Sequence, residues 1–499
     1  MDLQFQKTVC RCLDAVICEV QNTEQTQELR ISDGMPDIGR ILSAWAQPVI
    51  RGKEWRGDSI SLNGGVLIWV LYAPEDGTEP RCVDSWIPFQ MKWDLPEDCP
   101  DGQIRVQMLP RSVDARSVSA RKVMLRVGLG VLAQALVPME AEFWSADGVP
   151  EDVQLLSERY PVRMMVESGE KAFLMDEEFA MPGSAPQPEK LIYYTVSPRI
   201  MDQKVMGDKV VFRGNGNLHV LYRSEEGQLH GWDFPLPFSQ YADLRENYPG
   251  EARADVSLCP TSLELELDDE GHLRFKCGLA AQYVVDNQQM IEVVEDAYAP
   301  ARTVQPEHGT VLLPVVLDSR QENIYAEQTI PADVNLAADI RFWPDFPRQY
   351  GAENSLRMEV PGMFQALYYD ENGSLQGSSG RWEGALQLKA APDTRITAIP
   401  QSGQEPQLAL SDGTMTLKSE LPLAVNTFAR QKIPAVTGLC LGEEQEPNPE
   451  RPSVILCRAG KMRLWDIAKE NGSTVEAIRS ANGIQQEPEP GQMLLIPIC

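Results

Sequence analysis

Most of the chain alternates apolar and polar residues with a period of two. Two clear runs are Ile104-x-Val106-x-Met108 and Val123-x-Leu125-x-Val127-x-Leu129. Short runs of this kind, separated by turns rich in Gly and Asp, are typical of the strands of all-β sandwiches and barrels. The pattern therefore predicts a mainly β fold for residues 1–441, and it leaves open whether each part closes as a barrel or packs as a sandwich.

The pattern changes in residues 454–497. Leu464, Ile467 and Ala468 recur at helical spacing, and a short apolar run lies on either side of this region. Asn-Gly pairs at 471–472 and 482–483 predict two helix ends, because both residue types tolerate the left-handed backbone of a helix stop.

Between these two stops, the stretch 473–476 (Ser-Thr-Val-Glu) matches a capping box that would open a second helix. The predicted order is strand, helix, helix, strand, which is a small α+β (βααβ) unit.

The β region repeats itself. A Tyr followed five residues later by Gly, through an acidic turn, occurs at 72–77, 222–227 and 368–373, so the tyrosines are 150 and 146 residues apart. Further residues that keep this period are Gly64 and Gly214, Phe89 and Phe238, and Trp86, Trp232 and Trp382. We interpret the repeat as three copies of one β unit, each containing a hairpin, with the repeated aromatic residues in the cores.

These boundaries divide the chain into five parts. We expect a first β unit with an N-terminal lead-in at 1–180, a second at 181–325, a third and divergent one at 326–441, a linker at 442–452 and the small unit at 453–499. The linker is acidic and rich in Pro, so we expect it to be extended and to hold the small unit away from the β units, open to a partner.

Charge and cysteine usage narrow the possible partners and compartments. The chain has 73 Asp and Glu against 45 Lys and Arg, a formal net charge of −28. This charge argues against nucleic acid and anionic membrane as partners. No apolar run is long enough for a transmembrane segment, and the first nineteen residues contain no export signal. Ten scattered cysteines without CxxC pairs indicate a reducing, cytoplasmic compartment.

Motifs of catalysis and metal binding are missing from the sequence. The four histidines are dispersed, and there is no HExxH, no Walker A loop and no G-x-S-x-G elbow. We therefore expect no enzyme activity, no catalytic residue, no cofactor and no metal. The alternative is a hydrolase on a β scaffold, and turnover of a muropeptide by the purified protein would support it.

The stretch Pro490-Gly491-Gln492-x-Leu494-x-Ile496-Pro497, with the βααβ order before it, resembles a LysM domain. The resemblance implies a groove that binds N-acetylglucosamine polymers between the loop before the first helix and the loop before the second strand. The groove residues that it implies are Gly460, Lys461, Met462, Arg463, Ile484, Pro490, Gly491 and Gln492.

The first groove loop departs from the family pattern. LysM domains usually have Gly-Asp-Ser/Thr where residues 460–462 are Gly-Lys-Met. The acidic residue and the hydroxyl that would cap the first helix are missing, and a cation lies near the positive helix end, which is unfavourable by roughly 0.3–1 kcal/mol. We therefore expect that this surface binds a protein.

The segment 36–42 (Pro-Asp-Ile-Gly-Arg-Ile-Leu) and the segments 210–214, 219–225 and 232–241 resemble the SPOCS repeat of sporulation proteins. SPOCS repeats followed by a LysM domain resemble a clostridial family of spore coat morphogenetic proteins.

This resemblance implies a non-enzymatic scaffold in spore coat assembly, located in the mother-cell cytoplasm at the forespore surface. It also implies that the LysM unit binds the polymerising basal-layer ATPase of the coat (SpoIVA-like), with other coat proteins as further candidate partners. The alternative is a LysM protein of the cell wall or cortex that binds peptidoglycan through N-acetylglucosamine.

Overall fold

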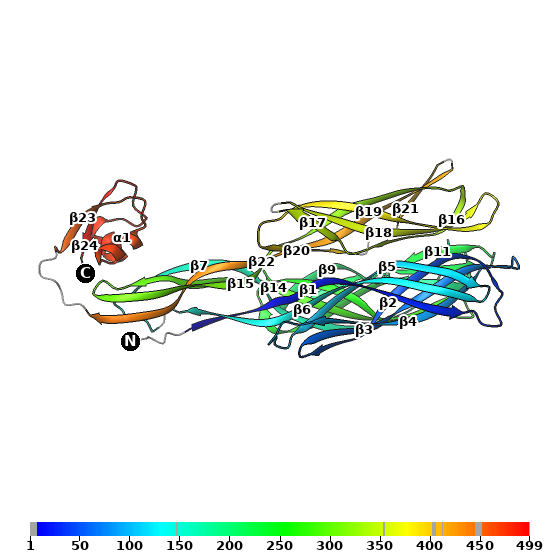
Figure 1. The fold of residues 1–499 in the computed structure, drawn as a ribbon, viewed down its shortest axis with the longest axis horizontal. Coiled ribbons are helices and arrows are strands. Elements are labelled where there is room, and N and C mark those ends of the chain that lie inside the picture. Colours follow the sequence, from blue (N-terminus) through cyan, green and yellow to red (C-terminus); the bar gives the residue numbers. More distant parts are fainter. Residues whose placement is uncertain are drawn as a thin grey trace.

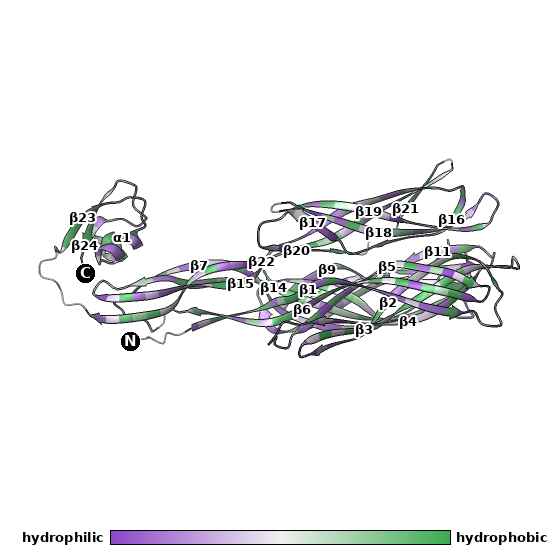
Figure 2. Cartoon of the chain, in the orientation of Figure 1, coloured by the Kyte–Doolittle hydropathy of each residue, from purple (hydrophilic) through white to green (hydrophobic). Residues whose placement is uncertain are grey.

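The computed structural model describes residues 7–145, 148–352, 355–401, 406–411, 413–444 and 452–498. The protein is elongated (Figure 1): a head of stacked β-sheets continues into an arm of long strands, and a small module with two helices lies at the end of the arm. Apolar and polar residues alternate along many of the strands (Figure 2), as the period of two predicts. The mainly β fold followed by a small α+β unit is thus confirmed.

The first unit consists of two antiparallel sheets that face each other across one core. Its strands are β1 (Lys7–Arg30), β6 (Lys122–Trp144) and β5 (Gln103–Ser119) in one sheet, and β2 (Ile38–Arg56), β3 (Ser59–Pro74) and β4 (Arg81–Asp94) in the other. Val123 and Leu125 on β6 and Ile60 and Ile68 on β3 are fully buried in the same apolar cluster. The apolar positions predicted at 123–129 therefore form one face of this sandwich core.

The second and third units contain related sets of strands. The second has β7 (Gln154–Ala180), β14 (His272–Tyr298) and β13 (Arg253–Leu267), with β8 (Pro188–Val196), β10 (Leu218–Ser224) and β11 (Leu229–Phe234), and the pair β9 (Arg199–Asn215) and β12 (Pro237–Tyr248). The third has β15 (Arg302–Pro331), β22 (Thr414–Glu444), β20 (Thr394–Pro400) and β21 (Gln407–Ser411), with β16 (Val334–Pro344), β17 (Arg348–Ala352), β18 (Ser355–Asp370) and β19 (Leu375–Lys389).

The repeated Tyr has the same structural role in the first two units, and the repeated Gly has the same role in all three. Tyr72 donates a hydrogen bond to the carbonyl of Pro36 at 3.0 Å, and Tyr222 donates to the carbonyl of Pro186 at the same distance. The glycines that end the three turns have positive φ angles of 71°, 83° and 75°, at Gly77, Gly227 and Gly373. Each turn joins two paired strands, so the predicted repeat of hairpins is present.

The arm is built from three two-stranded ribbons, one from each unit. β1 pairs with β6, β7 with β14, and β15 with β22. Each ribbon contributes four side chains to one apolar cluster: Cys10, Cys12, Ala141 and Phe143; Val162, Met164, Ile291 and Val293; Leu313, Val315, Ile433 and Ala435. The three units therefore share a core along the arm in addition to their separate cores in the head.

The ribbons also indicate where each unit begins and ends. The expected ranges 1–180 and 181–325 assign β7 and most of β15 to the preceding unit, although these strands pair with β14 and β22. We therefore propose 7–144, 154–298 and 302–444 as the three units. Most of the expected linker, residues 445–451, lies outside the described residues.

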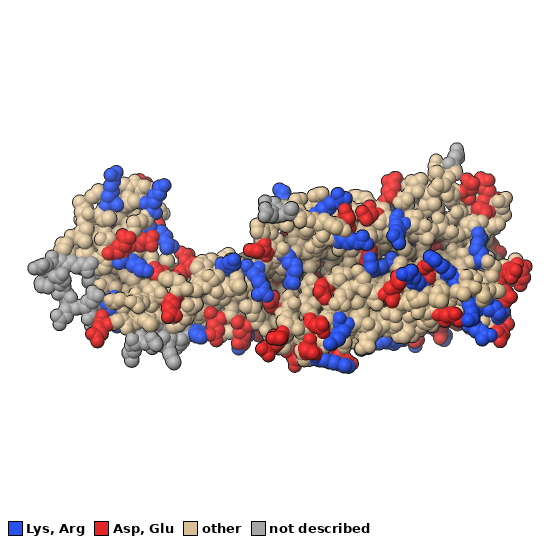
Figure 3. Space-filling view, viewed as in Figure 1, with Lys and Arg blue, Asp and Glu red and all other residues tan. Residues whose placement is uncertain are grey.

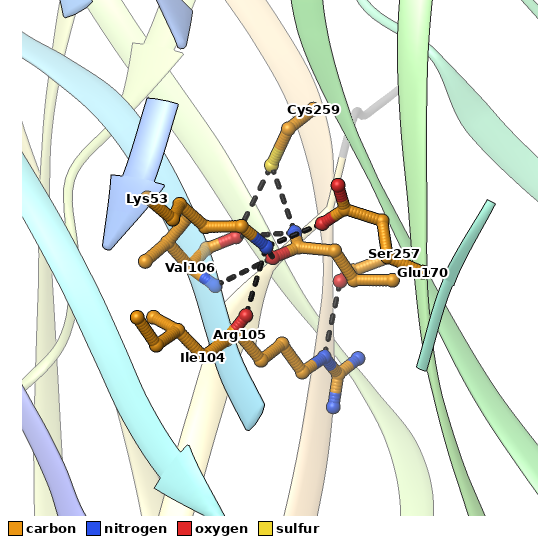
Figure 4. A network of polar contacts seen from close by, with 8 residues as sticks. Lys53, Ile104, Arg105, Val106, Glu170, Ser257 and Cys259 are labelled. Carbon is orange, nitrogen blue, oxygen red and sulfur yellow. Dashed lines mark hydrogen bonds and ion pairs between the residues drawn. The ribbon is translucent and has the colours of Figure 1, made fainter. Parts of the chain in front are cut away.

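A partly buried polar network joins the first two units (Figure 4). Lys53 donates to the carbonyl of Ile104 and to Oε1 of Gln282, each at 2.8 Å, and forms an ion pair with Glu170. The side-chain amide of Gln282 donates to the carbonyl of Val106 at 2.8 Å, and its oxygen accepts the N–H of Val106 at 2.9 Å. Because these donors and acceptors satisfy one another across the contact, they fix how the two units dock.

The small module has the predicted order of elements. β23 (Val454–Arg458) pairs with β24 (Met493–Pro497), and α1 (Leu464–Asn471) and α2 (Val475–Asn482) lie between them. Gly472 and Gly483 end the helices in the left-handed conformation, with φ near 63° and 64°. One detail of the prediction is wrong: Thr474, and not Ser473, caps α2, because its hydroxyl accepts the backbone N–H of Ala477 at 3.0 Å.

Candidate binding site on the helical module

Two loops of the module lie side by side. The backbone N–H of Ala459, just before the first loop, donates to the carbonyl of Gln492 at 2.8 Å, and the N–H of Gly491 donates back to the carbonyl of Ala459 at 2.7 Å. Gly491 has φ near 96°, a conformation that favours Gly. These bonds bring the loop at 460–463 next to the loop at 490–492, as the groove prediction requires.

The predicted groove residues differ in exposure. Gly460, Lys461, Arg463 and Pro490 are exposed, and Met462 is 40% exposed. Gly491 and Gln492 are half-buried, as is Ile484, which packs against the module's core. The accessible surface is therefore the cationic and apolar loop 460–463 with Pro490, whereas Ile484 supports it from within.

The first helix is capped by residues outside the family motif. The N–H of Leu464 donates to Oε2 of Glu487 at 2.7 Å, and the N–H of Arg463 donates to Oδ2 of Asp466 at 3.2 Å. Two carboxylates thus lie at the positive end of α1, where they are favourable. The cap that the family motif would supply is missing, since the side chain of Arg463 at the N-cap accepts no hydrogen bond. Glu487 takes its place from the loop before β24, and a local motif cannot show this.

The module differs from the rest of the chain in charge. Residues 453–498 contain five Lys and Arg and five Asp and Glu, so the net charge of −28 belongs to the β units and the linker. Figure 3 shows cationic side chains on the side of the module that points away from the arm. A partner with carboxylates could approach this side without the repulsion expected from the β units.

The opposite side of α1 is covered by the tip of the second ribbon. Asp296 on β14 accepts hydrogen bonds from Nε1 of Trp465 at 2.8 Å and from Nζ of Lys469 at 2.8 and 2.7 Å. Tyr298 donates to the carbonyl of Ser473 at 2.9 Å. The expectation that the linker holds this module away from the β units is therefore wrong. No local pattern in the sequence predicts this contact, because Asp296 and Trp465 are 169 positions apart.

A second buried polar cluster joins the second and third units. Nδ1 of His219 lies 3.0 Å from Asp233, its Nε2 lies 3.1 Å from Asp339, and Tyr193 donates to Asp339 at 2.6 Å. Arg341 donates to Asp233 at 3.3 Å. Burial and Arg341 would lower the pKa of His219, but the two carboxylates outweigh them and raise it. As a cation, the ring would carry an N–H toward each of the two carboxylates, so a protonated His219 adds charge complementarity to this contact.

A cavity of about 780 Å³ lies where the three units meet. Arg105 and Arg341 line it, but each guanidinium already bonds a carboxylate, Asp255 at 2.7 Å and Asp233 at 3.3 Å. Cys259, also on the wall, donates to the carbonyl of Val106, and burial raises the pKa of this thiol to about 12. The cavity therefore contains paired charges and a thiol that stays protonated at neutral pH.

Family models match two parts of the chain. The model described as SipL, SPOCS domain matches residues 187–266, which run from β8 to β13 in the second unit, and the LysM domain model matches residues 464–497. No curated protein and no solved structure matches the chain.

The chain thus combines a SPOCS domain with a LysM domain that follows it. Both are binding domains, neither indicates an enzyme family, and together they fit a protein of sporulation or of cell-wall binding. Among the described residues, no helix is long and apolar enough to cross a membrane.

Proposed function

We propose that this protein is a non-enzymatic adaptor of spore coat assembly, which acts in the mother cell at the forespore surface. Its LysM domain binds the polymerising ATPase of the basal coat layer, and its β units act as a scaffold that other coat proteins can join. The observation that carries the proposal is the exposed loop 460–463, in which Lys461 and Arg463 flank Met462 beside the loop at 490–492.

The chemistry of this loop suits a protein surface better than a sugar. Lys461 and Arg463 offer charge contacts at the rim of an interface, and Met462 offers an adaptable apolar contact. Glu487 already accepts the hydrogen bond of the Leu464 N–H, so that backbone donor at the start of α1 is taken. A neutral sugar would have to displace this charge-assisted bond to use the same donor.

The decisive experiment is a binding assay between the intact protein and the purified ATPase. Lys461→Glu reverses one exposed charge on the loop, and we expect it to weaken binding about tenfold, the loss typical of a close charge pair at an interface. Arg479→Glu makes the same change on α2 as a control and should leave affinity within about twofold. Equal effects of the two substitutions, with both proteins folded by circular dichroism, would remove the loop from the interface.

A glycan ligand is the second candidate, because the LysM model itself matches residues 464–497. Calorimetric titration of the intact protein with N-acetylglucosamine oligomers of increasing length tests it. Saturable binding that tightens with oligomer length would place peptidoglycan ahead of the ATPase. We expect no heat from the folded protein, which would leave the groove to a protein partner.

A further inference from the structure

The contact between the LysM domain and the arm is built from few but specific interactions. Trp465 and Lys469 lie one helical turn apart on α1, so a single carboxylate, that of Asp296, can accept from both. Trp465 is only 7% exposed, and its ring meets that of Tyr298 edge-on, with centroids 4.7 Å apart at 74°. Tyr298 also belongs to the module's apolar core.

The charges in this contact favour the docked arrangement. Burial alone would raise the pKa of Asp296, but the hydrogen bonds from Lys469 and Trp465 outweigh it and lower this pKa. The carboxylate is therefore more stable as an anion here than in water, and Lys469 is its charged partner at 2.7 Å. His308 on β15 adds a weaker contact, with Nε2 at 3.8 Å from Asp296.

The sequence distinguishes the second ribbon from the other two at the place of this contact. Ala141 on β6, Ile291 on β14 and Ile433 on β22 all lie in the shared core of the arm. Five and seven residues after each of these three, the sequence has Ala and Gly at 146 and 148, Asp and Tyr at 296 and 298, and Gly and Cys at 438 and 440. Asp296 and Tyr298 thus explain why the LysM domain contacts the second ribbon and not one of the two related ones.

We propose that Asp296 and Tyr298 are positioning residues for the LysM domain. They clamp the inner side of α1 to the arm and hold loop 460–463 outward at a fixed distance from the head. The arm then acts as a rigid spacer between the bound partner and the three β units. This role rests on the proposed function, since it concerns how the same LysM surface is presented to the ATPase.

A charge-swap series in the intact protein tests the clamp. Asp296→Lys places two cations together and should release the module. The double variant Asp296→Lys with Lys469→Asp restores opposite charges and should restore docking. Glu292→Lys makes the same charge change at an exposed position of β14 that pairs with Arg159, so it serves as the matched control. X-ray scattering gives the spread of head-to-module distances, and hydrogen exchange reports the amides around 296–298 and 473.

We expect Asp296→Lys to broaden the distance distribution, speed exchange at these amides and weaken ATPase binding about tenfold, a usual size for coupling between sites. The double variant should recover all three readouts, and Glu292→Lys should resemble the wild type. Unchanged scattering and exchange in Asp296→Lys would overturn the clamp.

Two further results separate the clamp from the proposed function. A released module that binds the ATPase with wild-type affinity would overturn the positioning role while leaving the proposed function standing. A wild-type protein that does not bind the ATPase would contradict the proposed function and, with it, the positioning role. Scattering and hydrogen exchange would still show whether the contact between the LysM domain and the arm exists.

Discussion

At the scale of single residues, Glu487 provides the hydrogen-bond acceptor for the backbone N–H of Leu464, the first residue of α1. Its carboxylate accepts the N–H of Leu464, which replaces the cap that the LysM motif normally encodes just before the helix. We predict that Glu487→Ala destabilises α1 by about 1 kcal/mol, the usual cost of losing a cap. The measurement is hydrogen exchange at the amides of α1, and Glu489→Ala in the same exposed loop is the control. Identical exchange in both variants would contradict the assigned role of Glu487.

Single residues differ in whether their structural role could be predicted from the sequence. The turn glycines Gly77, Gly227 and Gly373 and the helix stops were predictable, because a positive φ leaves a local signature in the sequence. Glu487 and Asp296 were not, because they act on α1 from 23 and 169 residues away. A carboxylate in a loop or strand end has many possible partners, and only the folded backbone selects one of them.

At the scale of elements, the arm depends on a core that no ribbon can form alone. Each two-stranded ribbon has one apolar face, and an isolated hairpin is at best marginally stable in water. The strand periodicity predicted such faces, and the repeat predicted three copies of the unit. Nothing local indicated that the ends of the units extend beyond the head and pack together, since this depends on the pairing of β1 with β6, β7 with β14 and β15 with β22.

The shared core of the arm leads to a prediction for Phe143, which is 1% exposed within it. Phe143→Ala should cost roughly 3–5 kcal/mol, as large-to-small core substitutions do. Because the cluster includes side chains of all three ribbons, hydrogen exchange should rise in β7, β14, β15 and β22 as well as in β6. Faster exchange confined to β1 and β6 would show that the ribbons fold independently of one another.

At the scale of the whole molecule, pH should act on the contact between the second and third units. His219 is 2% exposed and lies between Asp233 on β11 and Asp339 on β16, with Tyr193 of β8 and Arg341 of β16 facing the same cluster. When the ring is protonated, two cations balance two carboxylates. When the ring loses its proton, one cation faces two carboxylates, and the carboxylate of Asp339, which is buried, loses part of the charge that compensates it.

The sign of the effect follows from the raised pKa of His219. Its stabilisation is complete below the unfolded value of about 6.5, and it is lost as pH rises through the higher folded value. We therefore predict that the free energy of unfolding of the wild type falls with rising pH from about 6.5 upward. His219→Gln should be less stable at low pH and show a shallower slope. Denaturant titrations at several pH values measure this, with His272→Gln, a more exposed histidine on β14, as the control that keeps the wild-type slope. A slope that survives in His219→Gln would place the titrating group elsewhere and leave the docking of the third unit independent of pH.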